Sequence, residues 1–303
     1  MTTANIQNAL PVAAKIDEPL DLAVVIPAYN EEGAIVATVE AVRQALDPLG
    51  ITYEIIAVND GSTDNTLQEA RRSGARVINQ PGNIGYGAAL KAGILNSRST
   101  YVAILDADGT YPPSCLPHML EIAQTSDMVV GDRGVAMKNV PLIRRPAKWI
   151  LNGLANFLAE RNIPDLNSGL RVFKRDSLMP FLKLLPNGFS FTTTITLSMI
   201  CSGLIIHYTP IAYGKRIGSS KIRAVHFFSF ILLVLRIVML FQPLRIFLPF
   251  GAILFTLGVA KLVYDFTLYD VSESAIFCLL ASLIVWSLGL IADMISRLHL
   301  KPA

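Results

Sequence analysis

The chain has 303 residues, of which 52% are hydrophobic and only 16% are charged, against about 25% charged in an average globular protein. The net charge of +3 is small and no long basic run exists, which argues against a nucleic-acid-binding protein. Three scattered cysteines without metal-ligand spacing indicate free thiols in a reducing compartment. Because the apolar excess lies between residues 227 and 295, we expect a soluble domain followed by a membrane region.

The N-terminal segment 1–20 has one lysine, two acids and no apolar core of the length that a secretory signal needs. We expect it to be disordered and the following domain to stay in the cytoplasm. From residue 21 onward, short apolar runs alternate with helical patterns. The predicted strands are 22–27, 53–58, 76–79, 102–105 and 128–130, and the predicted helices are 31–47, 64–73, 85–96 and 114–125. This order predicts an α/β fold, with a mostly parallel sheet covered by helices on both faces.

Ligands of such sheets bind beyond the carboxyl ends of the strands, so the residues after each strand are the candidates for a site. The first strand runs into IPAYNEEG (26–33), the second into VNDGSTDNT (58–66) and the fourth into DADGTYPP (106–113). Each motif places acids, glycines or an aromatic ring at a strand end. Asn30 and Asp64 are also predicted to cap the helices that follow them.

Taken together, IPAYNEE, VNDGSTD, NIGYGAALKAGI (83–94) and DADGTYPP resemble the family 2 glycosyltransferases with the GT-A fold. GDR (131–133), DLNSGLRVFKR (165–175) and RIGSSK (216–221), followed by apolar helices, are similar to motifs of polyprenyl-phosphate glycosyltransferases of the dolichol-phosphate mannose synthase type. The resemblance covers residues 21–225 and implies a GT-A (Rossmann-like) domain over 21–222.

Two carboxylates one residue apart, Asp106 and Asp108, repel each other unless a cation or water compensates them. Magnesium takes one or two carboxylates together with substrate phosphates, so these residues suit Mg²⁺ or Mn²⁺ bound to a nucleotide diphosphate. The resemblance implies the same metal site. Many relatives carry a glutamine where this chain has Thr110, which leaves the choice of metal open.

The first two strand ends are expected to bind the nucleotide. Tyr29 can stack on a ring, Glu31 can accept from hydroxyl groups and Asp60 can accept from the base. Asn59 replaces an aspartate common in the family, so the base cannot be read from it. The full predicted nucleotide-sugar set is Pro27, Ala28, Tyr29, Glu31, Asn59, Asp60, Asp106, Ala107 and Asp108.

Arginine suits phosphate because its planar fork donates twice. The resemblance implies that Arg133 and Arg144 face the phosphate of the acceptor, and that Arg216, Ser220 and Lys221 bind phosphates near the membrane. Arg171, in SGLRVF, is predicted to be catalytic together with Asp106 and Asp108.

A phosphate monoester is largely dianionic at pH 7, so no side chain has to deprotonate it. We therefore expect metal and positioning to dominate, with no obligatory general base. Asp165 is the first candidate for a base if one is needed, although a helix cap or a loop hydrogen bond explains it about as well. Inversion at the anomeric carbon is an expectation from the family.

The C-terminal region 245–297 contains two apolar stretches, 246–264 and 275–295, each long enough to cross a bilayer. The loop between them has no lysine or arginine, whereas Arg245, Arg297 and Lys301 flank the pair, so both termini are expected in the cytoplasm. A shorter stretch, 226–241, contains Arg236. It predicts an interfacial helix over 223–244 rather than a third crossing.

The sequence thus predicts an enzyme of the inner membrane that moves one sugar from a nucleotide diphosphate sugar to a polyprenyl phosphate at the cytoplasmic leaflet. GDP-mannose and UDP-glucose are both open as donors, and a homo-oligomer is open too. A processive polysaccharide synthase is disfavoured because neither Trp149 nor Trp286 lies in a QxxRW motif. The remaining alternative is a non-catalytic membrane scaffold or glycolipid transport component on a degenerate fold.

Overall fold

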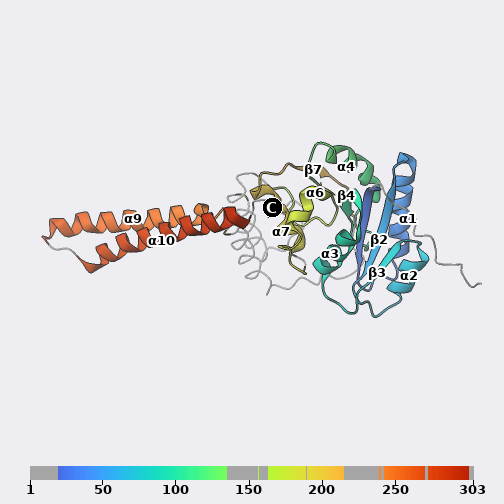
Figure 1. The fold of residues 1–303 in the computed structure, drawn as a ribbon, viewed down its shortest axis with the longest axis horizontal. Helices are drawn as coiled ribbons and strands as arrows, with labels where there is room; N and C mark the ends of the chain where they lie inside the picture. The colour runs from blue at the N-terminus through green and yellow to red at the C-terminus, as the bar shows by residue number, and fades with distance from the viewer. Residues whose placement is uncertain are drawn as a thin grey trace, which may run out of the picture.

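The computed structural model describes residues 20–134, 156, 163–188, 190–214, 239, 242–269 and 272–299. The predicted disordered segment 1–20, apart from its last residue, and the predicted interfacial helix 223–244, apart from Met239 and its last three residues, lie outside these ranges. Figure 1 shows a sheet domain with helices on both faces and a pair of long helices that extends away from it beyond α7 (Phe191–Cys201).

Seven strands form one sheet in the order β3-β2-β1-β4-β6-β5-β7. All neighbouring pairs are parallel except those of β6, which runs antiparallel to both β4 and β5. The strands are β1 (Leu20–Ala28), β2 (Tyr53–Asn59), β3 (Arg76–Asn79), β4 (Ser99–Ile104), β5 (Met128–Asp132), β6 (Arg171–Lys174) and β7 (Ile206–Pro210). The mostly parallel sheet and the five predicted strands are confirmed, whereas β6 and β7 were not predicted.

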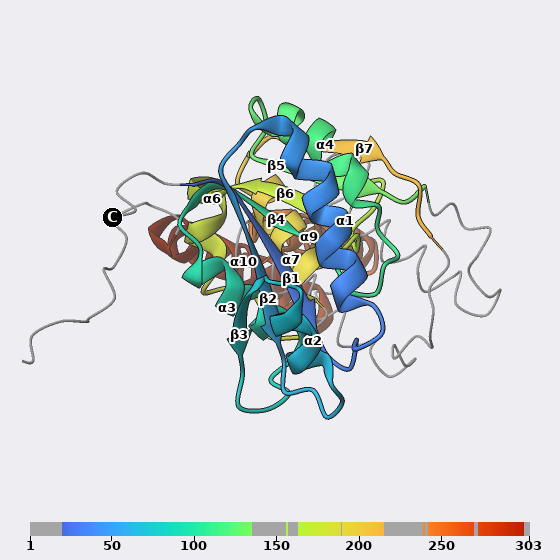
Figure 2. The ribbon, with the colours of Figure 1, turned by 90° about the vertical axis from the view of Figure 1, so that its right-hand side faces the viewer.

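Helices cover both faces of the sheet, as predicted. They are α1 (Ile35–Leu46), α2 (Thr66–Arg72), α3 (Tyr86–Asn96), α4 (Leu116–Ala123), α6 (Arg175–Leu178) and α7, with short 3-10 turns η1 (Asp47–Leu49), η2 (Pro113–Cys115) and η5 (Met179–Phe181). In Figure 2, α1 lies in front of the strands and the long C-terminal helices lie behind the sheet domain. The first helix begins four residues later than predicted, because residues 29–34 form a loop between β1 and α1.

The alternation of side chains along β1 produces two hydrophobic cores. Ala23 and Val25 enter the core that α3 and α7 cover, while Val24 and Ile26 enter the core that α1 and α4 cover. Successive side chains of a strand point to opposite faces, so a strand covered on both sides needs apolar residues at every position. This requirement explains the unbroken apolar run that ends in Pro27 and Ala28.

The C-terminal hairpin consists of α9 (Leu244–Thr267) and α10 (Glu273–His299), each long and apolar enough to cross a membrane. The two helices pack through small residues: a Cβ on Gly258 would stand 2.9 Å from Leu279 Cγ, and Trp286 Nε1 donates to the Leu248 carbonyl oxygen at 3.2 Å. Near the start of α9, Ile246 packs against the core on the α7 face of the sheet. The two predicted apolar helices are confirmed, with longer bounds than expected.

Candidate active site

The carboxyl ends of β1, β2, β4 and β5 meet at one edge of the sheet. β1 is parallel to β2 and β4, and β5 has the same direction because both β4 and β5 are antiparallel to β6. The loops after these four strands carry most of the described residues that the sequence singled out. The edge is therefore the place where their side chains can act together.

The loops after β1 and β2 are joined by side-chain hydrogen bonds. Asn30, whose φ of 56° is left-handed, accepts from the Thr63 amide at 2.9 Å, and its own amide donates to Ser62 Oγ at 3.0 Å. The Glu31 amide donates to Thr66 Oγ1 at 2.8 Å. The prediction that Asn30 caps the first helix was wrong, since that helix begins after Ala34 and Asn30 instead fixes one loop against the other.

The N-cap of α2 is Asn65, one residue after the predicted cap Asp64. Asp64 Oδ1 still accepts from the amide of Thr66, the first residue of α2, at 3.0 Å. Burial by itself raises the pKa of Asp64, but the hydrogen bonds from Thr66 and Glu32 outweigh it and lower the pKa below its usual value. In the chain after β1, Tyr29 and Glu31 are half-buried and follow the buried Pro27 and Ala28.

Asp60 and Asn59 lie at the end of β2, and both are 3% exposed. The carboxylate of Asp60 accepts from two amides, Ile84 N at 2.8 Å and Gly85 N at 3.0 Å. Asn59 Nδ2 donates to Asn79 Oδ1 at 2.7 Å. Both predicted nucleotide-binding residues thus also hold the loop that leads into α3.

The two aspartates after β4 are half-buried and are oriented by different parts of the protein. Asp108 Oδ1 accepts from Thr110 Oγ1 at 2.6 Å and from the Thr110 amide at 3.1 Å, within its own loop. Asp106 Oδ1 accepts from the hydroxyl of Tyr86 on α3 at 2.8 Å. Between them, the buried Ala107 accepts through its carbonyl from Thr38 Oγ1 of α1 at 3.0 Å.

Thr110 is 2% exposed, and its hydroxyl supports Asp108. Tyr86 was not predicted as a site residue, although it is part of the NIGYGAALKAGI motif. Burial first, and then the charge of Asp106, raise the pKa of Tyr86 well above its usual value, so its hydroxyl remains a hydrogen-bond donor at neutral pH.

The DLNSG loop, 165–169, lies against the metal-site candidates. Arg133, directly after β5, donates from Nε to Asp165 Oδ2 at 2.7 Å and from Nη2 to Asp165 Oδ1 at 2.8 Å. The Gly169 amide donates to the Tyr111 hydroxyl at 2.7 Å. Burial, followed by the charge of Asp106, raises the pKa of Tyr111 to about 12.

The ion pair with Arg133 bears on whether Asp165 is a general base or a structural hydrogen-bond acceptor. Burial by itself raises the pKa of Asp165, but the hydrogen bonds and charge of Arg133 outweigh it and hold the pKa below its usual value. A carboxylate with a lowered pKa is a weak base. Asp165 is therefore better explained by a loop hydrogen bond than by proton transfer.

Arg171, which the sequence predicts to be catalytic, has a side chain that is fully buried within the domain. Its guanidinium donates to the carbonyl oxygens of Ser168 and Leu166, both at 2.9 Å, and to Thr196 Oγ1 at 2.6 Å. These hydrogen bonds hold the DLNSG loop, and a catalytic role of Arg171 stays a prediction. Desolvation lowers its pKa from the usual value.

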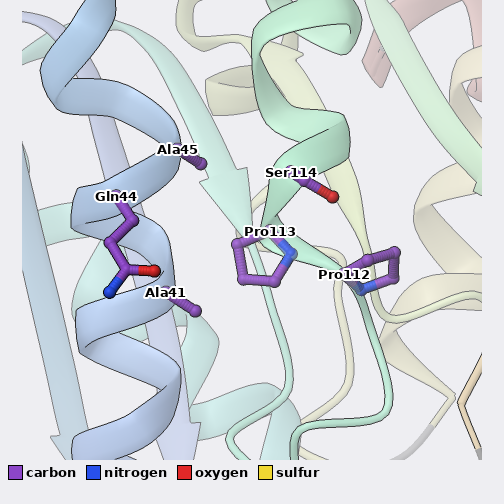
Figure 3. A pocket seen from close by; sticks show the side chains of 6 residues that line it. All are labelled: Ala41, Gln44, Ala45, Pro112, Pro113 and Ser114. Atoms are coloured by element: carbon purple, nitrogen blue, oxygen red, sulfur yellow. The ribbon is translucent and has the colours of Figure 1, made fainter.

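Four further predicted residues, Arg144, Arg216, Ser220 and Lys221, lie outside the described residues. A pocket on the surface is a separate feature (Figure 3). It lies between α1 and the start of η2 and is lined by Ala41, Gln44, Ala45, Pro112, Pro113 and Ser114. None of these is a predicted site residue.

The donor set at the edge fits a divalent cation that is shared with a ligand. Asp106 and Asp108 supply hard carboxylate oxygens, and among the described residues no group of three or more His, Cys, Asp and Glu side chains forms a complete protein cage. Mg²⁺ is typically bound by one or two carboxylates plus substrate phosphates and water, and Mn²⁺ prefers the same donors. The residues present therefore fit such an ion.

Comparison with known proteins identifies the family. Residues 23–181 match the family described as Glycosyl transferase family 2, and residues 242–298 match the one described as GtrB C-terminal hairpin. This chain belongs to glycosyltransferase family 2. The predicted family and enzyme class are confirmed: the protein is a glycosyltransferase.

Two relatives extend this finding. A dolichyl-phosphate hexose transferase of Haloferax volcanii is 34% identical over 67% of this chain and 86% of its own length. A dodecaprenyl-phosphate galacturonate synthase of Rhizobium johnstonii is 28% identical over 94% of this chain and 90% of its own length. The second match includes the C-terminal hairpin.

The fold of the family 2 domain has counterparts among solved structures. The glucosyl-3-phosphoglycerate synthase of Mycobacterium tuberculosis, in complex with Mn²⁺, UDP and glucosyl-3-phosphoglycerate, aligns with a TM-score of 0.55 at 20% identity. The alignment covers 73% of this chain and 78% of the synthase. The GT-A fold predicted from the motifs is thereby confirmed.

Proposed function

We propose that this family 2 glycosyltransferase moves one sugar from a nucleotide diphosphate sugar to a polyprenyl phosphate. The observation that carries the proposal is the pair Asp106 and Asp108 at the same sheet edge as the loops after β1 and β2, in a chain that ends in two apolar helices. The names of the two relatives, which specify dolichyl and dodecaprenyl phosphate, support a lipid phosphate acceptor.

Asp106 and Asp108 would hold the cation, Mg²⁺ or Mn²⁺. When bound there, such an ion supplies electrostatic stabilisation of the leaving diphosphate. The loops after β1 and β2 would bind the nucleotide, with Tyr29 stacking and Glu31 accepting from hydroxyl groups. Four further predicted residues are buried at this edge: Pro27, Ala28, Asn59 and Ala107. Asp60 already accepts two amide hydrogen bonds, but a carboxylate has about four lone-pair sites, so it retains capacity for a base.

The acceptor phosphate would bind on the Arg133 side of the edge. Arg133 uses two of its five N–H groups on Asp165, so three remain to donate to an anion. Arg144, Arg216, Ser220 and Lys221 are proposed to bind phosphate as well; Arg216, Ser220 and Lys221 lie in the sequence between β7 and α9. A dianionic acceptor attacks without a base, with inversion at the anomeric carbon.

The hairpin of α9 and α10 would cross the inner membrane twice, with the catalytic domain and both termini in the cytoplasm. The arginines and lysines that flank the hairpin favour this orientation. A reporter fused after Ala303 tests it: the proposal requires a cytoplasmic signal, and a periplasmic signal excludes a hairpin with two crossings.

The reaction is tested with the purified full chain, a polyprenyl phosphate and Mg²⁺ or Mn²⁺, across a panel of nucleotide sugars that includes GDP-mannose and UDP-glucose. We expect release of the nucleoside diphosphate and a labelled lipid product with at least one donor. Asp106→Asn and Asp108→Asn should each abolish transfer while the protein remains folded. Release of nucleotide from none of the donors would instead favour the membrane scaffold or transport component.

A further inference from the structure

Tyr86 is the first residue of α3, and its side-chain hydroxyl donates a hydrogen bond to Asp106 in the loop after β4. Its hydroxyl lies 2.8 Å from Asp106 Oδ1. Asp108 differs, because Thr110 in the same loop orients it. Thus the orientation of Asp108 is fixed within its own loop, whereas that of Asp106 is fixed by a residue of α3.

The start of α3 is itself fixed by contacts on two sides. Asp60 accepts from the amides of Ile84 and Gly85, the two residues before Tyr86. On the other side, the Ala88 amide donates to the Asn187 carbonyl oxygen at 3.0 Å. Because these bonds hold the backbone at Tyr86, its ring has a defined position from which to donate.

We propose that Tyr86 is a positioning residue for the metal site: its hydroxyl holds the Asp106 carboxylate in the orientation that binds the divalent cation. This inference rests on the proposed function, since it requires Asp106 to be a metal ligand. A hydrogen bond from an outer-shell residue, such as that from Tyr86 to Asp106, orients a ligating carboxylate for the metal. The segment 84–86 also connects Asp60, at the nucleotide side, to Asp106, at the metal side.

The test measures Mn²⁺ binding directly, by electron paramagnetic resonance of free Mn²⁺, on the full chain in detergent with UDP or GDP present. Replacing outer-shell partners of a metal ligand typically lowers metal affinity 10- to 100-fold. We expect Tyr86→Phe to raise the Mn²⁺ dissociation constant by roughly 10-fold or more, and to raise the metal concentration for half-maximal transfer by the same factor. The KM for the lipid acceptor should stay unchanged.

Tyr53→Phe is the matched control, because Tyr53 also donates from its hydroxyl to a carboxylate, that of Asp47, but at the opposite end of the sheet. This variant should bind Mn²⁺ like the wild type. Tyr86→His, which retains a ring N–H, should recover part of the affinity, and it decides the question if Tyr86→Phe does not fold.

Three outcomes separate the proposals. If the wild type binds Mn²⁺, Asp106→Asn does not, and Tyr86→Phe binds as tightly as the wild type, the positioning role is refuted and the proposed reaction stands. If the wild type binds no Mn²⁺ with either nucleotide, the metal site fails and the role of Tyr86 fails with it. A weakened Tyr86→Phe beside an unchanged Tyr53→Phe supports the inference.

Discussion

Gly169 packs directly against the carboxylate of Asp106: a Cβ built on Gly169 would stand 2.7 Å from Asp106 Cγ. The amide of the same glycine donates to the hydroxyl of Tyr111. The DLNSG loop therefore presses its one residue without a side chain against the candidate metal ligand. Even one added methyl group would have to displace either the loop or the carboxylate.

Gly169→Ala should therefore lower Mn²⁺ affinity and metal-dependent transfer by about 10-fold or more, because it moves Asp106 from its position. Isothermal titration with Mn²⁺ and a nucleoside diphosphate measures the effect. Gly33→Ala is the control, since a Cβ on Gly33 meets no described atom within 4 Å. Equal affinities for the two variants would show that the contact does not orient Asp106.

Arg171→Met should lower the free energy of unfolding by about 3 kcal/mol. It leaves the carbonyl oxygens of Ser168 and Leu166 buried without this donor, and each such loss typically costs about 1–3 kcal/mol. Thermal unfolding should show a melting temperature lower by roughly 6–12 °C. Arg72→Met, at an exposed ion pair, should shift it little. A stable Arg171→Met that loses only its turnover would instead support the predicted catalytic role.

The Arg133–Asp165 pair should make stability depend on pH in the acid range. The folded pKa of Asp165 is lowered, so its contribution is present above the unfolded pKa of about 3.9 and is lost as the pH falls through the folded pKa. Asp165→Asn should cost about 3 kcal/mol at pH 7 and flatten the loss of stability below about pH 4. Unfolding measured between pH 2 and pH 7 tests both effects.

The control for this pair is Glu54→Gln, which breaks the more exposed ion pair with Arg76. Such pairs contribute about 0–1 kcal/mol, so its curve should follow that of the wild type. An Asp165→Asn curve that keeps the full acid slope would mean that another group carries the pH dependence.

Thr110→Val should weaken metal-dependent transfer, while Thr110→Ser should retain it. The valine loses the hydroxyl that donates to Asp108 Oδ1 at 2.6 Å, and the serine keeps that donor. The measurement is the rate of transfer as a function of metal concentration for both variants. Valine keeps the size of the threonine side chain, and serine keeps its hydroxyl. If both behave alike, Asp108 does not need the hydroxyl of residue 110 to bind the cation.

Much of the site was predictable because its residues follow apolar strands directly. Five strands could be recognised from runs of apolar residues, and in a parallel sheet their ends must meet at one edge. Two aspartates after the fourth strand then imply a cation. β6 and β7 were not among the predicted strands, although β6 resembles the predicted β3 in length and in its mixture of polar and apolar residues.

By itself, the sequence determined the family through the resemblance of its ordered motifs. It determined the α/β fold and the two apolar helices through composition and periodic patterns that are local in the chain. Only the tertiary structure decided that Arg171 is buried and that Tyr86 donates to Asp106. Burial of an arginine side chain is unfavourable unless its N–H groups are hydrogen-bonded. The carbonyl oxygens that accept from Arg171 come into position only when the DLNSG loop has folded. Likewise, Tyr86 and Asp106 are 20 residues apart and meet only when α3 packs beside the end of β4. Which polar groups pair inside a fold depends on such long-range geometry, which no local pattern encodes.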